Sequence, residues 1–109
     1  MEYRRLGRSG LNISKLALGT MNFGNPTDKA ESFDIIYTAL DAGINILDCA
    51  DVYAEGKSER IIGEALAESG KRNEVLLTSK VFLPVGTGPN DAGNSKHHII
   101  NACEGSLKR

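Results

Sequence analysis

Three short apolar clusters alternate with three stretches of helical periodicity, and this alternation constrains the fold more than any other feature. The clusters lie at residues 16–18, 44–47 and 75–77 and are rich in branched side chains. They show no clean polar alternation, which predicts buried strands. Successive strand–helix units of about thirty residues require parallel strands with right-handed crossovers. The sequence therefore predicts an α/β protein with a parallel sheet.

Capping residues indicate where the helices begin and end. Apolar residues recur at three- and four-residue spacing over residues 28–43 and 58–70, and again after Ser95. Asp28, with Glu31 three residues later, resembles a capping box. Glycines at the ends of the first two stretches suit a left-handed stop. Three amphipathic helices are therefore expected.

The first fifteen residues lie outside the strand–helix rhythm. Residues 3–6 and 11–14 flank a turn at residues 7–10, which predicts a short N-terminal β-hairpin. No linker or low-complexity stretch divides the chain, so residues 1–109 are predicted to form part of a single domain.

Two architectures fit three strand–helix units: a doubly wound open sheet, or the opening of a TIM (β/α)8 barrel. An open nucleotide-binding sheet would normally carry G-x-G-x-x-G after its first strand. Residues 19–24 read Gly-Thr-Met-Asn-Phe-Gly, which does not match. The pattern favours the barrel, of which this chain would hold the first three βα units.

The composition excludes several classes of protein. Thirteen Lys and Arg against 14 Asp and Glu give a formal charge of −1, which offers no general attraction for nucleic acid. The longest apolar runs are far shorter than the roughly 20 residues of a membrane-spanning helix, and no apolar signal segment follows residues 1–10. Cys49 and Cys103 lie far apart and are interpreted as reduced thiols of a cytoplasmic protein.

Polar side chains follow the predicted strands where barrel active sites lie. Asp48 ends the second apolar cluster, Lys80 follows the third, and Tyr53 lies in the loop after Asp48. Barrel active sites form at the carboxyl ends of the strands, and neighbouring strands lie only about 4.8 Å apart. We therefore expect these side chains to meet.

Such a trio has a specific chemistry. A tyrosine hydroxyl titrates near pH 10, too high for efficient proton transfer at neutral pH. A nearby lysine ammonium favours the tyrosinate, and an aspartate keeps the lysine charged and oriented. The result is a general acid that protonates a carbonyl oxygen while another group delivers hydride.

Other interpretations of these residues stay open on spacing alone. Asp48 is equally well explained as a capping carboxylate, Lys80 as a solvated residue at a strand end, and Tyr53 as a half-buried aromatic side chain.

Residues outside the trio have simpler interpretations. Glu59 is most simply a solvated helix charge, and Cys49 a buried thiol with nothing nearby to activate it. His97 and His98 lie side by side without nearby metal-ligating partners, so no metal site is predicted.

Several segments resemble one family in the right order along almost the whole chain. They are residues 3–11, 18–24, 42–53 and 78–81. With these segments the chain resembles the N-terminal part of an aldo-keto reductase. It is most similar to the branch of general-stress-type oxidoreductases and potassium-channel β subunits. It departs at Cys49, where the family usually has Thr, and at Ala54, where Gly is commoner.

The resemblance implies a (β/α)8 barrel that reduces an aldehyde or ketone with a nicotinamide cofactor, usually NADPH. By that resemblance Tyr53 is the proton donor, Lys80 lowers the pKa of Tyr53, and Asp48 orients Lys80. Asp48 also belongs to the implied cofactor-binding residues, which are Gly19, Thr20, Met21 and Asp48. The loop 82–94 matches one that often borders the substrate opening.

The resemblance also implies missing parts. The histidine of the family's catalytic tetrad belongs to a fourth strand beyond Arg109, as do the segments that hold the adenosine phosphate. Neither His97 nor His98 matches the histidine motif. We expect an incomplete barrel that is inactive alone; the alternative is a non-catalytic truncated module that binds a partner through an exposed sheet edge. The sequence leaves open the carbonyl substrate, the choice between NADPH and NADH, and the oligomeric state.

Overall fold

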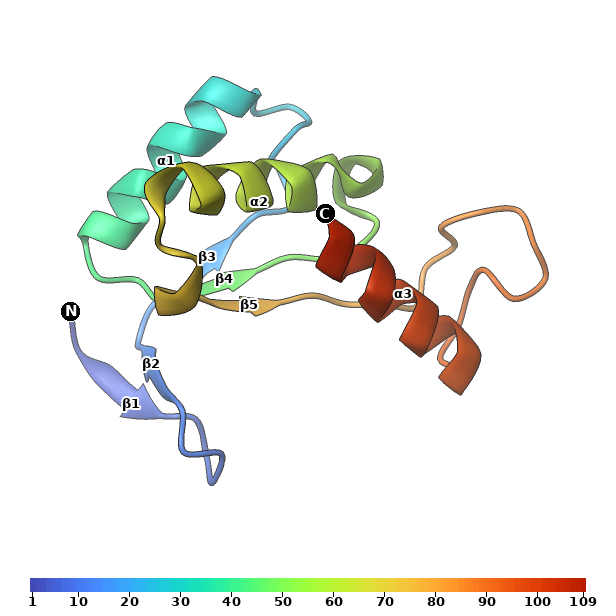
Figure 1. Ribbon diagram of the computed structural model, residues 1–109, viewed down its shortest axis with the longest axis horizontal. Coiled ribbons are helices and arrows are strands. Elements are labelled where there is room, and N and C mark those ends of the chain that lie inside the picture. The colour runs from blue at the N-terminus through green and yellow to red at the C-terminus, as the bar shows by residue number, and fades with distance from the viewer.

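The computed structural model describes residues 1–109 and contains two small sheets, three α-helices and two 3₁₀ turns (Figure 1). The strands are β1 (Tyr3–Arg5), β2 (Asn12–Ser14), β3 (Leu18–Gly19), β4 (Ile46–Asp48) and β5 (Leu76–Thr78). The helices are α1 (Lys29–Asp41), η1 (Tyr53–Gly56), α2 (Lys57–Ser69), η2 (Arg72–Glu74) and α3 (Lys96–Lys108).

The main sheet is parallel, in the order β3-β4-β5. Each pair of neighbouring strands is joined through a helix, which confirms the predicted succession of βα units. The predicted hairpin is present as the antiparallel pair β1–β2. The Tyr3 hydroxyl connects this hairpin to the rest of the molecule by donating a hydrogen bond to the backbone oxygen of Gly43 at 2.9 Å.

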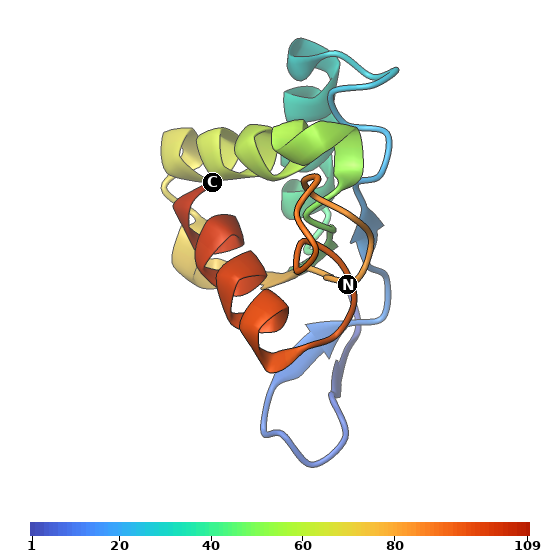
Figure 2. The ribbon, with the colours of Figure 1, turned by 90° about the vertical axis from the view of Figure 1, so that its right-hand side faces the viewer.

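Helices α1 and α2 lie side by side against the sheet, and the core fills the space between them (Figures 1 and 2). Nine buried residues form the core: Phe23, Ile36, Leu47, Cys49, Ile61, Ile62, Ala65, Leu66 and Val75. Cys49 is 3% exposed, as expected for a buried thiol. Burial of this apolar set is what fixes the three strand ends relative to the helices.

The caps predicted at Asp28 and Ser95 form, but a cap at Ser58 is wrong: α2 begins at Lys57, its N-cap is Gly56, and no side chain caps it. The Asp28 carboxylate accepts from the backbone N–H of Glu31 at 2.9 Å, and the Ser95 hydroxyl oxygen accepts from that of His98 at 3.0 Å. Helix α2 ends at Gly70, whose φ of +69° is the left-handed conformation that glycine adopts without strain.

The strands differ from the prediction in position and burial. Each begins one or two residues later than its apolar cluster, so Asp48 and Thr78 are the last residues of β4 and β5. Strand β5 is not buried: Leu77 is 39% exposed. The reason is that β5 is an outer strand, paired on one side only.

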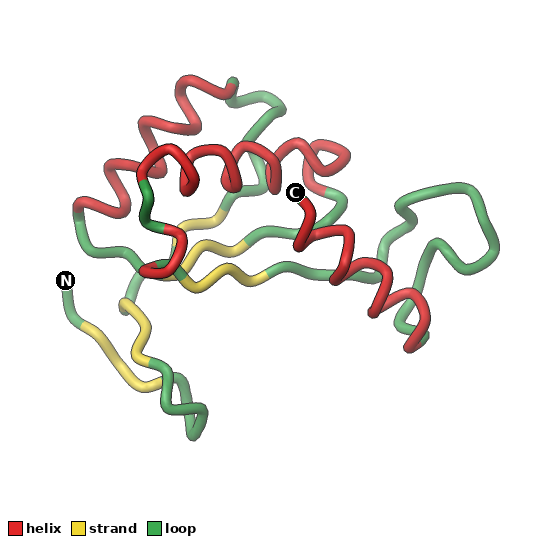
Figure 3. The backbone as a smooth tube through the Cα atoms, in the orientation of Figure 1, coloured by secondary structure: helices red, strands yellow, loops and turns green.

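Helix α3 follows a long loop at residues 79–95, and its C-terminal end lies against α2 (Figures 1 and 3). Ile99, Ile100 and Leu107 on this helix are exposed. No helix of the structure has the length and apolar character needed to cross a membrane.

Candidate active site

The carboxyl ends of the three parallel strands align and form one rim. Gly19 pairs with Asp48, and Asp48 pairs with Thr78, so the last residues of β3, β4 and β5 lie in one row. Lys80 lies two residues beyond β5, and Tyr53 is the first residue of η1. The strand register therefore brings all three predicted residues to the same place.

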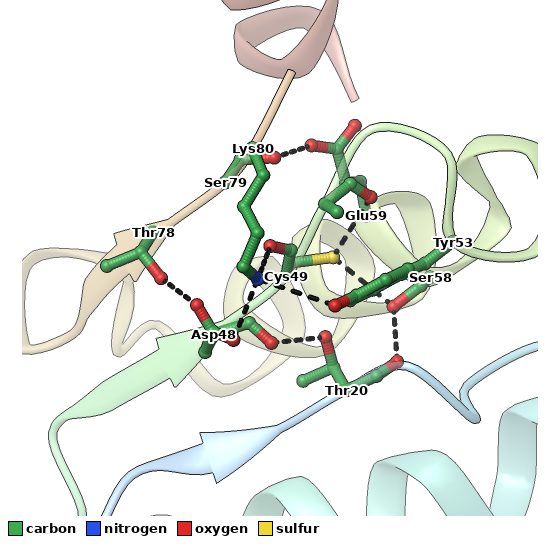
Figure 4. Close-up of polar contacts among 10 residues, drawn as sticks. Thr20, Asp48, Cys49, Tyr53, Ser58, Glu59, Thr78, Ser79 and Lys80 are labelled. Carbon is green, nitrogen blue, oxygen red and sulfur yellow. Dashed lines mark hydrogen bonds and ion pairs between the residues drawn. The ribbon is translucent and has the colours of Figure 1, made fainter. Parts of the chain in front are cut away.

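The Lys80 ammonium occupies the centre of the site (Figure 4). Its Nζ donates to Asp48 Oδ2 at 2.8 Å, to the backbone oxygen of Cys49 at 2.6 Å and to Tyr53 Oη at 3.4 Å. A charged lysine has three N–H donors, and each has an acceptor here. The arrangement fits the charged form of Lys80.

The Asp48 carboxylate is held at both oxygens. Oδ2 accepts from Lys80, and Oδ1 accepts from the Thr78 hydroxyl at 2.6 Å. These hydrogen bonds, from Lys80 first and then Thr78, hold the pKa of Asp48 below its ordinary value against the opposing effect of burial. The structure therefore favours the interpretation of Asp48 as the partner of Lys80 over that of a capping carboxylate.

The pKa of Lys80 is the result of opposing effects. Burial alone lowers it, but the hydrogen bonds with Asp48 and Tyr53 outweigh burial and raise the pKa above its ordinary value. Lys80 is thus a fixed positive charge at neutral pH, although about half of its side chain is exposed.

The phenol of Tyr53 is oriented by Lys80. Because the ammonium can only donate, Tyr53 Oη is the acceptor in their contact, and the phenolic proton points elsewhere. The backbone of Tyr53 is fixed by its N–H, which donates to the Ala50 oxygen at 3.2 Å. Ala54 and Glu55, which follow Tyr53, both have left-handed backbones, with φ of +48° and +57°.

A buried hydrogen-bonded group beneath the rim was not predicted from the sequence. Ser58 Oγ donates to the backbone oxygen of Thr20 at 2.8 Å and lies 3.3 Å from Cys49 Sγ (Figure 4). Thr20 Oγ1 donates to the backbone oxygen of Asp48 at 2.9 Å. The only sequence signal was the proximity of Ser58 to the start of a helix.

The interpretation of Glu59 as a solvated helix charge is wrong. Glu59 is 8% exposed, accepts from the Ser79 hydroxyl at 2.6 Å and forms an ion pair with Arg109 at 2.6 Å. Its partners come from β5's exit and from the end of α3, so neither was visible in the local sequence.

The two histidines lie outside the site. His98 Nδ1 pairs with the backbone oxygen of Gly93 at 2.8 Å, and His97 Nε2 with Asn101 Nδ2 at 3.1 Å. No group of three or more His, Cys, Asp or Glu side chains is placed to hold a metal ion.

The predicted cofactor residues lie beside the trio at the same rim. A Cβ added to Gly19 would meet no atom within 4 Å, and Met21 is 63% exposed. Thr20, between them, is fully buried. Gly19 and Met21 are therefore open to an approaching group at the rim, whereas Thr20 is covered.

Comparisons with known proteins agree with this geometry. A family model described as the aldo/keto reductase family matches residues 15–109. The chain is 48% identical over 118 residues to the uncharacterized oxidoreductase YrpG of Bacillus subtilis, covering all of this chain and 36% of that protein. It is 44% identical over 111 residues to a probable voltage-gated potassium channel subunit beta of rice, covering 34% of it.

A solved structure shows the same fold. The aldo-keto reductase AKR11C1 from Bacillus halodurans, in its holo form, superposes with a TM-score of 0.85 at 36% identity. The match covers 99% of this chain and 36% of that one. The chain thus spans about a third of the length of the relatives it matches.

Fold and site together define an α/β protein with its polar residues at the carboxyl ends of parallel strands. The chain belongs to the aldo/keto reductase family. The family resemblance stated from the sequence is confirmed.

Proposed function

We propose that this chain supplies the proton-donating part of an NADPH-dependent reductase that converts an aldehyde or ketone to an alcohol. One observation carries the proposal: Lys80 Nζ joins Asp48 to Tyr53 at the rim of the sheet, within 2.8 and 3.4 Å. In such an arrangement the phenol can donate its proton to a substrate oxygen, while the charged lysine stabilises the phenol oxygen and the carboxylate holds the lysine.

Tyr53 is the proton donor of the proposed reaction. Its oxygen accepts a hydrogen bond from Lys80, so its proton is free to bond a carbonyl oxygen that approaches the rim. As the proton leaves, negative charge develops on the phenol oxygen, and the ammonium stabilises it. Asp48 keeps Lys80 in place and charged. Of the four predicted cofactor residues, Gly19, Met21 and Asp48 would contact NADPH, which when bound supplies the hydride, and the buried Thr20 would support their loop from within.

We propose that the three βα units are the first three of a (β/α)8 barrel, and that residues 1–109 are part of one domain. A barrel of this kind takes about 250 residues, and the chain spans about a third of its relatives. The family's tetrad histidine and phosphate-binding segments would come from later residues, so we propose that the 109-residue chain alone is inactive. Its free cysteines fit the reducing cytoplasm.

A chimera tests the proposed function. Residues 1–109 replace the matching segment of B. subtilis YrpG, the 48% identical relative, and the remaining two thirds come from YrpG. We expect the chimera to oxidise NADPH in the presence of simple aldehydes. The loss of NADPH absorbance measures this reaction. A folded chimera that oxidises neither NADPH nor NADH with any of a panel of aldehydes and ketones would contradict the proposal.

A second candidate function is binding of a partner protein. Strand β5 has an unpaired edge with Leu77 39% exposed, and such edges accept added strands. Relatives named as potassium channel beta subunits make this function worth testing. The chimera separates the two functions, because a partner-binding module needs neither NADPH nor the phenol of Tyr53.

A further inference from the structure

Three buried polar side chains connect the loop after β3 to the end of β4 and the start of α2 (Figure 4). Thr20 and Ser58 are fully buried, and Cys49 is 3% exposed. Ser58 comes from the first turn of α2, Cys49 directly follows β4, and Thr20 directly follows β3. No hydrogen bond joins any of the three side chains to Tyr53, so the proton-transfer chemistry above does not account for them.

The directions of these hydrogen bonds follow from the chemistry of each group. A backbone oxygen only accepts, so the single proton of the Ser58 hydroxyl is committed to the Thr20 oxygen, 2.8 Å away. In the 3.3 Å contact between Cys49 Sγ and Ser58 Oγ only the thiol is then left to donate, and the backbone oxygen of Ala50, 3.6 Å from Cys49 Sγ, is a second acceptor for the same thiol proton. Thr20 in turn donates its own hydroxyl proton to the Asp48 oxygen at 2.9 Å.

The result is a closed ring of contacts. It runs from Cys49 to Ser58, from Ser58 to Thr20, and from Thr20 to Asp48, the residue before Cys49. The backbone N–H of Thr20 also donates to the Asp48 oxygen, at 3.1 Å. Ser58 is the only member that brings α2 into the ring.

We propose that Ser58 is a positioning residue, whose hydroxyl fixes the loop 19–21 against β4 so that Gly19 and Met21 face the cofactor from a rigid backbone. The carbonyl oxygen of Thr20 accepts from the Ser58 hydroxyl at 2.8 Å and from the backbone N–H of Phe23 at 3.1 Å. Without Ser58 this buried oxygen keeps only the bond from Phe23, which lies in the same loop, and loses its one bond to α2. The loop would then be held less firmly against α2, and its two exposed neighbours could shift.

That Ser58 fixes the loop is inferred from the hydrogen bonds. That a fixed loop helps to bind the cofactor rests on the proposed function. The two parts are therefore measured separately. One experiment follows the order of the loop in the chain without any cofactor, and the other follows the affinity for NADPH in the chimera.

The first experiment compares amide hydrogen exchange in the 109-residue chain and its Ser58→Ala variant. We expect exchange at Thr20 and Phe23 to become at least tenfold faster, relative to amides in the middle of α1. Ser69→Ala is the matched control: this serine is on the same helix, and its hydroxyl donates to the Leu66 oxygen and accepts from the Lys71 N–H, both at the far end of that helix from the loop. Unchanged exchange at Thr20, or equal acceleration at all amides, would overturn the positioning role.

A measurement on the unsubstituted chain covers the case in which Ser58→Ala does not fold. The Ser58 hydroxyl proton should be visible by NMR as a slowly exchanging signal coupled to the Thr20 carbonyl carbon. A hydroxyl proton that exchanges as fast as that of the exposed Ser9 would overturn the proposal.

The second experiment measures the Kd for NADPH and the KM for an aldehyde in the chimera. Ser58→Ala should raise the Kd for NADPH at least fivefold with little change in the KM for the aldehyde, and Ser58→Thr, which keeps the hydroxyl, should restore the Kd. A purely structural defect would not be rescued in this selective way. Altered loop exchange with unchanged Kd would overturn the cofactor role of the loop and leave the proton-donor role of Tyr53 standing.

Discussion

The phenol oxygen of Tyr53 accepts a hydrogen bond from the Lys80 ammonium, and this contact leads to a prediction about turnover. Tyr53→Phe removes the proton donor but leaves Asp48 and Lys80 paired at 2.8 Å. We expect turnover of the chimera to fall by about 10²–10⁴-fold, the usual contribution of a positioned general acid. The Kd for NADPH, measured by fluorescence titration, should change less than threefold.

The matched control is Tyr37→Phe. This tyrosine is also half-buried, but its hydroxyl neighbours are the Ala65 backbone oxygen, at 3.5 Å, and the Glu68 carboxylate, neither of which belongs to the candidate site. Near-normal turnover of Tyr53→Phe would remove Tyr53 from the mechanism.

Ala54 adopts a left-handed backbone with φ of +48°, a conformation in which a Cβ is strained and glycine is not. We therefore expect Ala54→Gly to stabilise the chain by about 0.5–1 kcal/mol, in spite of the greater flexibility of glycine in the unfolded state. The left-handed backbone at residue 54 also explains why Gly is commoner at this position in the family. The free energy of unfolding, from urea titration, is the measurement.

Ala67→Gly is the control for this prediction, and we expect it to lower the free energy of unfolding. Ala67 is exposed in the interior of α2, where glycine costs about 0.5–1 kcal/mol. If both substitutions destabilise the chain equally, the backbone of residue 54 is not strained.

The trio could be predicted at the level of residues because a simple rule applied. Residues after parallel strands meet at one rim, and Asp48 and Lys80 follow adjacent strands. The supporting contacts could not be predicted, because they depend on register and helix packing. Thr78 meets Asp48 across 30 residues of sequence, and Ser58 meets Thr20 across 38. Nothing in the local pattern distinguishes such a serine from a helix-capping one.

At the level of elements, a buried ion pair fastens α3 to α2. Glu59 and Arg109 have side chains only 7% and 23% exposed, and Ser79 supplies another hydrogen bond to Glu59. Burial alone raises the pKa of Glu59, but the hydrogen bonds from Ser79 and Arg109 outweigh it and lower the pKa below its ordinary value. A carboxylate with a lowered pKa stabilises the fold above its unfolded pKa of about 4.3, and this contribution is lost as the pH falls through the lower folded value.

Glu59→Gln should therefore destabilise the chain at pH 7 by about 1–3 kcal/mol, because it leaves Arg109 without its charged partner. The difference from the unsubstituted chain should shrink as the pH falls below about 4, where Glu59 itself is increasingly protonated. Urea unfolding at several pH values measures both effects.

Glu64→Gln is the control for this prediction. Glu64 pairs with Lys29 on the surface, with both side chains more than half exposed, so we expect a change of about 0.5 kcal/mol or less. Equal effects of the two substitutions, or a Glu59→Gln difference that does not depend on pH, would show that the α2–α3 ion pair does not stabilise the fold.

Helices were easier to predict than strands because their signals are local. The caps Asp28 and Ser95 each bond an amide three residues later. Strand ends depend on pairing instead: β3 is confined to Leu18–Gly19, which pair with Leu47 and Asp48. The apolar residues before Leu18 have no strand partner, so the cluster at 16–18 predicted the strand too early.

At the level of the whole molecule, one side of the structure is open. The outer edge of β5 is unpaired, α3 exposes Ile99, Ile100 and Leu107, and a cavity of about 550 Å³ lies between α2, β5 and α3. Lys80 and Thr78 line this cavity, but Asp48 and Tyr53 do not. The cavity therefore adjoins the candidate site at Lys80. In the proposed barrel, a further strand and helix would pack on this side.

The last prediction concerns the 109-residue chain by itself. Under the proposed function its loop 19–21 would contact only the nicotinamide ring, and ring contacts alone do not hold a large, charged dinucleotide. We expect no measurable NADPH-dependent reduction of a simple aldehyde and a Kd for NADPH of about 1 mM or weaker, which corresponds to about −4 kcal/mol of binding free energy. The chimera, with the same Gly19, Asp48 and Lys80, should bind NADPH far more tightly. A micromolar Kd for the isolated chain would mean that these residues hold the whole cofactor, and the assignment of the remaining contacts to later segments would then be wrong.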